Sequence, residues 1–169
     1  MLSELRAAHA RLASILGPAA EPFEVLERGE AHRTFWRPDK PRVVLLAESH
    51  VYTTLEELSH SVRPDLPLPA NIPRGFVRLV YSLGYGENCF MDRNVISPRN
   101  SGTPQYWKIF QSCITSPGKR PDYASVQVSQ NLNPISRLSA KVAGLERLRE
   151  KGIWLVDASV ASLYLPGRA

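Results

Sequence analysis

Two short blocks of uninterrupted apolar residues, each followed at once by an acid, constrain the fold more than any other feature of the sequence. The blocks are Val43 to Ala47, before Glu48, and Ile153 to Val156, before Asp157. Neither block alternates polar and apolar residues, which is typical of strands covered on both faces of a mainly parallel sheet. Because ligands of such sheets bind at the carboxyl ends of the strands, we expect an α/β fold in which Glu48 and Asp157 lie together.

Helical periodicity in the apolar residues supplies the rest of the expected architecture. Five segments show it and are predicted to be helices: 3–16, about 54–61, 75–83, 104–113, and a last one that ends at 151 and starts at either 136 or 139. We expect residues 19–41 to be a linker and residues 116–133 to be a loop with a short strand near Val126. The length of 169 residues favours a single domain, with the N-terminal helix and linker in 1–40 and the core in 41–169.

Composition narrows the environment and the partners. No apolar stretch approaches the roughly 18 residues of a membrane span, and the N-terminus has no apolar signal core, so we expect a cytoplasmic protein without membrane contact. Cys89 and Cys113 are too few for a disulfide framework or a metal–sulfur site, so we expect buried thiols, no metal and no cofactor. The formal charge of +5 favours a polyanionic partner such as DNA.

The polar cluster Glu48-Ser49-His50 follows the first apolar block directly. A carboxylate and an imidazole at a strand end are the groups that activate water in general acid–base catalysis. The sequence therefore predicts an active site here with Glu48 and His50 as catalytic residues. The alternative is a solvated turn at the end of a strand.

Four short segments resemble motifs of the uracil-DNA glycosylase superfamily. Ala47-Glu48-Ser49-His50-Val51 is similar to that superfamily's Gly-Glu-Ala-Pro-Gly, although the Gly and the Pro are absent, and Tyr52 lies near an aromatic of its Gly-Gln-Asp-Pro-Tyr variant. Asn88-Cys89-Phe90 is similar to Leu-Cys-Phe, and Gly102-Thr103-Pro104 resembles a proline-rich loop that contacts DNA. Leu155-Val156-Asp157-Ala158 is similar to Leu-Leu-Asn-Ala, with an acid in place of the amide.

The resemblance implies a three-layer α/β/α fold with a central parallel sheet, and excision of uracil or a related deaminated base by base flipping. It implies that Glu48 positions water and that His50 stabilises the departing base. The base-binding residues it implies are Ser49, Tyr52, Asn88, Phe90 and Asp157. The DNA-binding residues it implies are Arg99, Gly102, Thr103, Pro104 and Lys108. The superfamily's later His-Pro-Ser type loop has no counterpart after Asp157, so we expect an incomplete sheet, completed by a continuation or a partner.

Two other functions fit the same residues. The strand end also resembles the Gly-Glu-x-His pattern of erythromycin-esterase-like hydrolases, in which Glu and His serve hydrolysis. A DNA-binding module, or a truncated and inactive glycosylase-like domain, would use the basic residues without cutting the nucleic acid. If the chain binds DNA, Trp36 is the tryptophan that we expect in a loop, where it could stack on bases. Trp107 and Trp154 fall within apolar patterns and are expected in the core.

Overall fold

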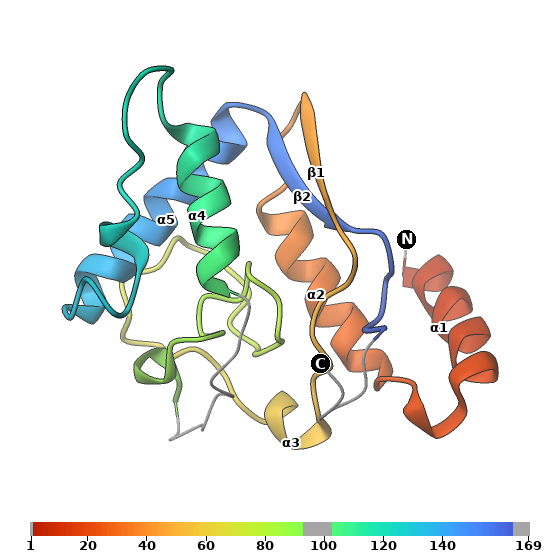
Figure 1. Ribbon diagram of the computed structural model, residues 1–169. Coiled ribbons are helices and arrows are strands. Elements are labelled where there is room, and N and C mark those ends of the chain that lie inside the picture. The colour runs from red at the N-terminus through yellow and green to blue at the C-terminus, as the bar shows by residue number, and fades with distance from the viewer. Residues whose placement is uncertain (1, 93–102, 164–169) are drawn as a thin grey trace.

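The computed structural model describes residues 2–92 and 103–163. Helices dominate it, and the two strands lie side by side (Figure 1). In chain order the elements are α1 Leu2–Leu16, η1 Gly17–Ala19, α2 Phe23–Phe35, β1 Val43–Ala47, α3 Leu55–Leu58, η2 Asn88–Phe90, α4 Thr103–Ile114, η3 Ala124–Val126, α5 Pro134–Glu150 and β2 Ile153–Asp157, where η marks a short 3-10 helix. The predictions of α1, α4, α5 and both strands are confirmed.

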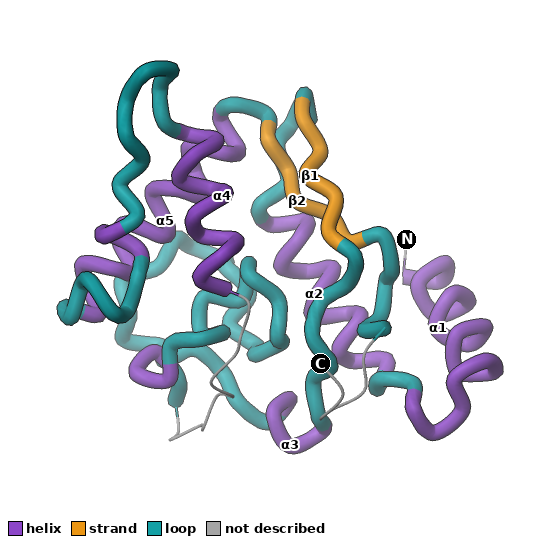
Figure 2. The backbone as a smooth tube through the Cα atoms, in the orientation of Figure 1, coloured by secondary structure: helices purple, strands orange, loops and turns teal. Residues whose placement is uncertain are grey.

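The strands form a two-stranded parallel sheet, drawn in orange in Figure 2. Their register runs from Val43 opposite Ile153 to Ala47 opposite Asp157. Beyond the strands, the amide of Ala158 donates to the carbonyl of Ala47 at 2.8 Å. The expectation that the two acid-terminated blocks are parallel neighbours is therefore confirmed, and the chain is a mixed helix and strand fold.

The prediction that β1 is covered on both faces is wrong. The side chains of Val44 and Leu46 are 53% and 71% exposed, whereas Leu155 of β2 is buried. Within the described ranges β1 pairs with β2 alone, so its other edge faces outward. An apolar block without alternation marks a strand, but it does not report how many neighbours that strand has.

Two predictions about the helices are also wrong. Residues 23–35 were expected in a linker and form α2, whose buried side includes the polar residues His32 and Arg33 and therefore lacks a clean apolar period. Residues 75–83 were expected to be a helix but start at an isolated β-bridge and continue as bends and turns. Their backbone amides form hydrogen bonds with other segments instead. The amide of Phe76 donates to His60 O, and the amide of Arg78 donates to Thr53 Oγ1.

Several smaller expectations fail as well. Val126 lies in η3 and not in a strand. Cys89 is exposed and Cys113 is partly exposed, so neither is a buried thiol. Trp36, expected to lie in a loop, directly follows α2 and is buried in the core. No helix in the described ranges has both the length and the apolar character that crossing a bilayer demands.

Candidate functional site at the strand ends

The carboxyl ends of β1 and β2 bring the predicted acids to one edge of the sheet. Glu48 follows the pair Ala47–Asp157 directly, and its carbonyl accepts a hydrogen bond from the amide of Ser159 at 3.1 Å. Glu48 is exposed to solvent. Tyr106 of α4 lies nearby: burial raises the pKa of its phenol, and the negative charges of Asp157 and Glu48 add to the rise. The site therefore combines two carboxylates and one aromatic ring.

A buried charge network lies beneath this edge, centred on Glu21. The carboxylate of Glu21 accepts hydrogen bonds from His50 Nε2, from the amide of Thr53 and from the amide of Ser162, each at 2.8 Å. These donors come from the loop after β1 and the segment after β2. One buried carboxylate, contributed by the short segment before α2, thus ties together the two loops that leave the strands.

His50 connects this carboxylate to the second acid of the site. With Nε2 donating to Glu21, Nδ1 is the acceptor and lies 3.4 Å from Arg33 Nη2. The same guanidinium nitrogen of Arg33 donates to Asp157 Oδ2. In the order Glu21, His50, Arg33, Asp157, the two basic side chains therefore lie between two buried carboxylates, and each carboxylate has a basic partner.

The placement of His50 does not fit the catalytic role predicted for it. Its side chain is 1% exposed, and both ring nitrogens already contact protein groups. A histidine that transfers protons to a substrate needs one nitrogen within hydrogen-bond reach of that substrate. His50 instead holds the loop after β1 in place, and Glu48 remains the exposed acid of the predicted catalytic pair.

A small cavity of about 90 Å³ lies at the strand ends. Ser49, His50 and Asp157 line it together with Tyr106 and Arg78. Three residues predicted from two separate motifs therefore do meet in one place. The pocket is narrow, however, because ordinary small-molecule pockets have volumes of roughly 300 Å³ or more.

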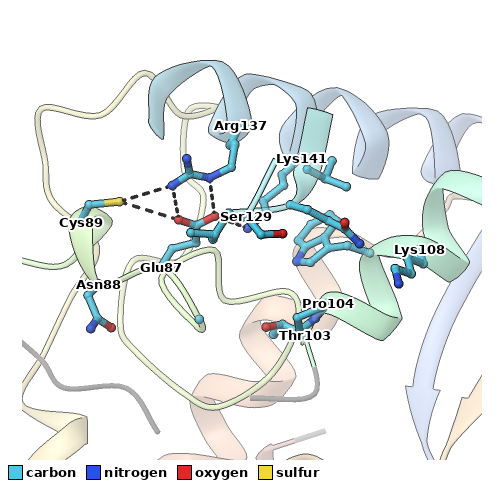
Figure 3. A pocket seen from close by; sticks show the side chains of 14 residues that line it. Glu87, Asn88, Cys89, Thr103, Pro104, Lys108, Ser129, Arg137 and Lys141 are labelled. Carbon is cyan, nitrogen blue, oxygen red and sulfur yellow. Dashed lines mark hydrogen bonds and ion pairs between the residues drawn. The ribbon is translucent and has the colours of Figure 1, made fainter. Parts of the chain in front are cut away.

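A larger cavity of about 670 Å³ lies between α4, α5 and the loop that carries Glu87 (Figure 3). Arg137 and Lys141 reach from α5 to the buried carboxylate of Glu87, at 2.7 and 2.6 Å. Burial acts to raise the pKa of Glu87, but the hydrogen bonds and charges of Arg137 and Lys141 outweigh it, and the net direction is downward. Burial lowers the pKa of Lys141, and the charge of Glu87 opposes that fall.

Four of the predicted residues line this second cavity: Asn88, Thr103, Pro104 and Lys108. The two cavities share no lining residue, so the predicted base-binding and DNA-binding residues fall into two groups. Phe90 belongs to neither group. Its ring is 0% exposed and packs in the core, so it offers no face on which a base could stack.

The remaining predicted residues are less informative. Tyr52 is half-buried in the loop after β1 and lines neither cavity. Arg99 and Gly102 lie outside the described residues. Within residues 2–92 and 103–163, no group of three or more His, Cys, Asp and Glu side chains is placed to hold a metal ion.

The structure adds residues that the sequence patterns did not single out as functional. Glu21 and Arg33 were placed in an expected linker, and Tyr106 falls in the segment 104–113, which was predicted only to be a helix. The sequence signal for Glu21 was its position directly before Pro22 and the start of α2, because the start of a helix fixes the direction of the residue that precedes it. For Arg33 no local pattern exists, since its partner Asp157 lies at the other end of the chain.

Comparisons of this chain with family models, with curated proteins and with solved structures give no significant match. Its function is therefore inferred from the geometry of the two cavities and from its short motifs.

Proposed function

We propose that this chain is a DNA glycosylase-type hydrolase that removes uracil or a related deaminated base. One observation carries the proposal. The parallel register sets exposed Glu48 directly beyond the Ala47–Asp157 pair, at the strand edge where ligands of α/β sheets bind. A carboxylate in that position can orient a water molecule and stabilise the positive charge that develops on the sugar as the glycosidic bond breaks.

Residues near Glu48 could bind the extruded base. Tyr106 presents a half-buried aromatic ring beside both carboxylates, which suits it to stack on an extruded base in place of buried Phe90. Asp157 is held by Arg33, so its orientation is fixed and its oxygens can accept hydrogen bonds from a base edge. Ser49 lines the same cavity and supplies a hydroxyl.

The packing around the strands supports the finer fold assignment. On one side of the sheet the indole of Trp154 donates to Arg33 O of α2 at 3.2 Å. Leu155 of β2, with Leu45 and Ala47 of β1, faces the opposite side of the sheet from Trp154. These three residues line a cavity together with Tyr106 and Ile109 of α4. Since alternate residues of a strand face opposite sides, contacts with α2 and α4 support the proposal of an α/β/α arrangement.

The second cavity suits contact with the DNA backbone. Lys108 is exposed on α4, and its neighbours Thr103 and Pro104 form the first turn of that helix. Helix N-termini and lysines are common contacts of phosphate groups. The formal charge of +5 makes such contacts favourable over the chain as a whole.

The direct test is base excision. The chain is incubated with oligonucleotides that contain uracil, hypoxanthine or a thymine mismatch, and alkali-labile sites are counted. Glu48→Gln should reduce the rate by roughly 100-fold or more, because the amide cannot take a proton from water. Glu56→Gln, an exposed acid on α3, is the matched control and should retain the wild-type rate.

Two results count against the proposal in different ways. Absence of product from every substrate would refute the enzymatic function. Equal rates for the wild type and Glu48→Gln would refute only the role of Glu48.

A second candidate function is DNA binding without cleavage. The small volume of the strand-end cavity, about 90 Å³, favours it, because an extruded base needs more room. This function predicts that the chain binds duplex DNA with an affinity that falls steeply as salt rises and does not depend on a damaged base. A fluorescence anisotropy titration against uracil-containing and undamaged duplexes separates the two candidates.

A further inference from the structure

Among the described residues, one edge of β1 has no backbone partner. The amide of Val43 donates to Gly152 O, and Ala47 O accepts from the amide of Ala158. Successive residues of a strand direct their backbone groups to opposite edges. The groups that bond to β2 are therefore those of Val43, Leu45 and Ala47. The N–H and C=O groups of Val44 and Leu46 point to the other edge. Within the described ranges β2 is the only strand beside β1.

The free edge is also apolar. Val44 and Leu46 are the residues with outward backbone groups, and their side chains are the most exposed of the strand. An apolar cavity of about 380 Å³ between β1 and α4 borders the same strand. Natural proteins protect such an edge with charges, prolines or a covering segment. This edge has no proline and no charge between Arg42 and Glu48.

The residues around this edge are complementary to themselves. The stretch reads Arg42, Val43, Val44, Leu45, Leu46, Ala47, Glu48. If two such stretches run antiparallel with Leu45 opposite Leu45, then Val44 lies opposite Leu46 and Arg42 lies opposite Glu48. Opposite charges in directly facing positions stabilise a strand pair, and the antiparallel arrangement supplies two such pairs.

The backbone directions are compatible with the same register. In antiparallel sheets, facing residues alternate between hydrogen-bonded and non-hydrogen-bonded pairs. Val44 and Leu46 both direct their backbone groups outward, so they form the hydrogen-bonded pair that the register requires. Leu45 directs its groups to β2, so it forms the non-hydrogen-bonded pair at the centre. The backbone directions therefore permit this register, and the facing charges of Arg42 and Glu48 single it out.

We propose that two copies of this chain associate through antiparallel pairing of their β1 strands around a two-fold axis at Leu45. The result is one continuous sheet in the order β2, β1, β1, β2, with a self-complementary interface of the kind that closed homodimers use. The pairing also places Arg42 of the second copy beside Glu48, so each copy contributes a cation to the strand-end site of the other. The association does not depend on the proposed glycosylase function.

The first experiment measures oligomeric state by sedimentation equilibrium from micromolar to hundreds of micromolar chain. The wild type is expected to form a dimer. Leu46→Lys should convert it to a monomer, since it places a charge on the paired edge. Leu132→Lys, at a leucine 83% exposed in a loop, is the matched control and should remain a dimer. A monomeric wild type, or a dimer unaffected by Leu46→Lys, would overturn the proposal.

Charge reversal tests the register. Arg42→Glu alone and Glu48→Arg alone each replace two attractive pairs by two repulsive ones, so each should weaken the dimer about tenfold. The double variant restores opposite charges across the axis and should recover the wild-type dissociation constant. Additive weakening in the double variant would rule out this register.

A crosslink gives a second measure that does not depend on affinity. In a chain with Cys89 and Cys113 replaced by Ser, Leu45→Cys should form an intermolecular disulfide, because facing non-hydrogen-bonded residues lie within disulfide range. Val43→Cys is the control on the same strand; it faces Ala47 of the second copy and should not crosslink to itself. Equal crosslinking of both variants, or none at Leu45→Cys, would contradict the arrangement.

Hydrogen exchange tests whether a second copy or another segment of the same chain covers the edge of β1. The amides of Val44 and Leu46 should become protected as the dimer forms and exchange rapidly at low concentration. Protection that is independent of concentration would mean that another segment covers β1, and would overturn the proposal.

Discussion

His32 should make the stability of this protein fall on mild acidification. Its side chain is buried in α2, and Nε2 lies 2.9 Å from Gly75 O, to which it donates. Among the described residues Nδ1 has no hydrogen-bond partner. A proton added there would be buried without an acceptor. Burial accordingly lowers the pKa of His32 from 6.5 to about 4. The hydrogen bond to Gly75 opposes this fall, and the positive charges of Arg33 and Arg28 add to it.

The sign and the size of the effect follow from this pKa. Because the folded state binds the proton more weakly than the unfolded chain does, the contribution of His32 to stability is complete above pH 6.5 and diminishes as pH falls toward about 4. At about 1.4 kcal/mol for each tenfold change in proton affinity, the whole interval corresponds to roughly 3 kcal/mol. That is a large part of the total stability of a small domain.

Urea unfolding at a series of pH values measures this contribution. His32→Gln keeps an N–H that can donate to Gly75 O but does not titrate, so its unfolding free energy should fall less than that of the wild type between pH 6.5 and pH 4. Contributions of other groups cancel in the difference between the two proteins. His9→Gln leaves His32 in place and should follow the wild type. Parallel curves for the wild type and His32→Gln would refute the reasoning.

The remaining predictions concern stability at neutral pH and are measured by the same unfolding assay. Glu87→Gln leaves the buried cations Arg137 and Lys141 without their counterion and should cost about 3 to 5 kcal/mol; a loss below 1 kcal/mol would mean that solvent reaches the cluster. Glu21→Gln disturbs a carboxylate that accepts three hydrogen bonds and should cost about 2 to 4 kcal/mol; an unchanged midpoint would contradict the network. Gly152→Ala adds a Cβ within 2.8 Å of a backbone oxygen at φ +74° and should cost at least 1 kcal/mol; a neutral effect would show that the turn relaxes.

The sequence was sufficient to locate the strands and their carboxyl ends, because runs of branched apolar residues bounded by polar ones have few alternative structures. The helices with a clean apolar period, such as α4 and α5, were predicted for the same reason. α5 also carries its own boundaries: the side chain of Asn133 accepts from the amide of Ser136 at its start, and Gly152 follows at φ +74°. Local signals of this kind depend on neighbours in the chain alone.

The errors arise where long-range contacts decide the structure. α2 buries His32 and Arg33, and their partners Gly75 and Asp157 are distant in sequence, so the helix lacked an amphipathic signature. His50 has the residue type of a catalyst, but its environment is set by Glu21, which no local pattern connects to it. Spacing alone could not separate a histidine that meets a substrate from one that is enclosed by charges.

The carboxylate of Glu21 also bears on when this protein can complete its fold during synthesis. One of its three donors, the amide of Ser162, is separated from it by 141 positions. A ribosome releases the N-terminal segment first, at roughly 5 to 20 residues per second, so Glu21 emerges many seconds before Ser162. Through that interval the acid stays hydrated or finds temporary partners, and α2 cannot reach its final packing. The contact between the segment before α2 and the segment after β2 is therefore completed late, once Ser162 has left the ribosome.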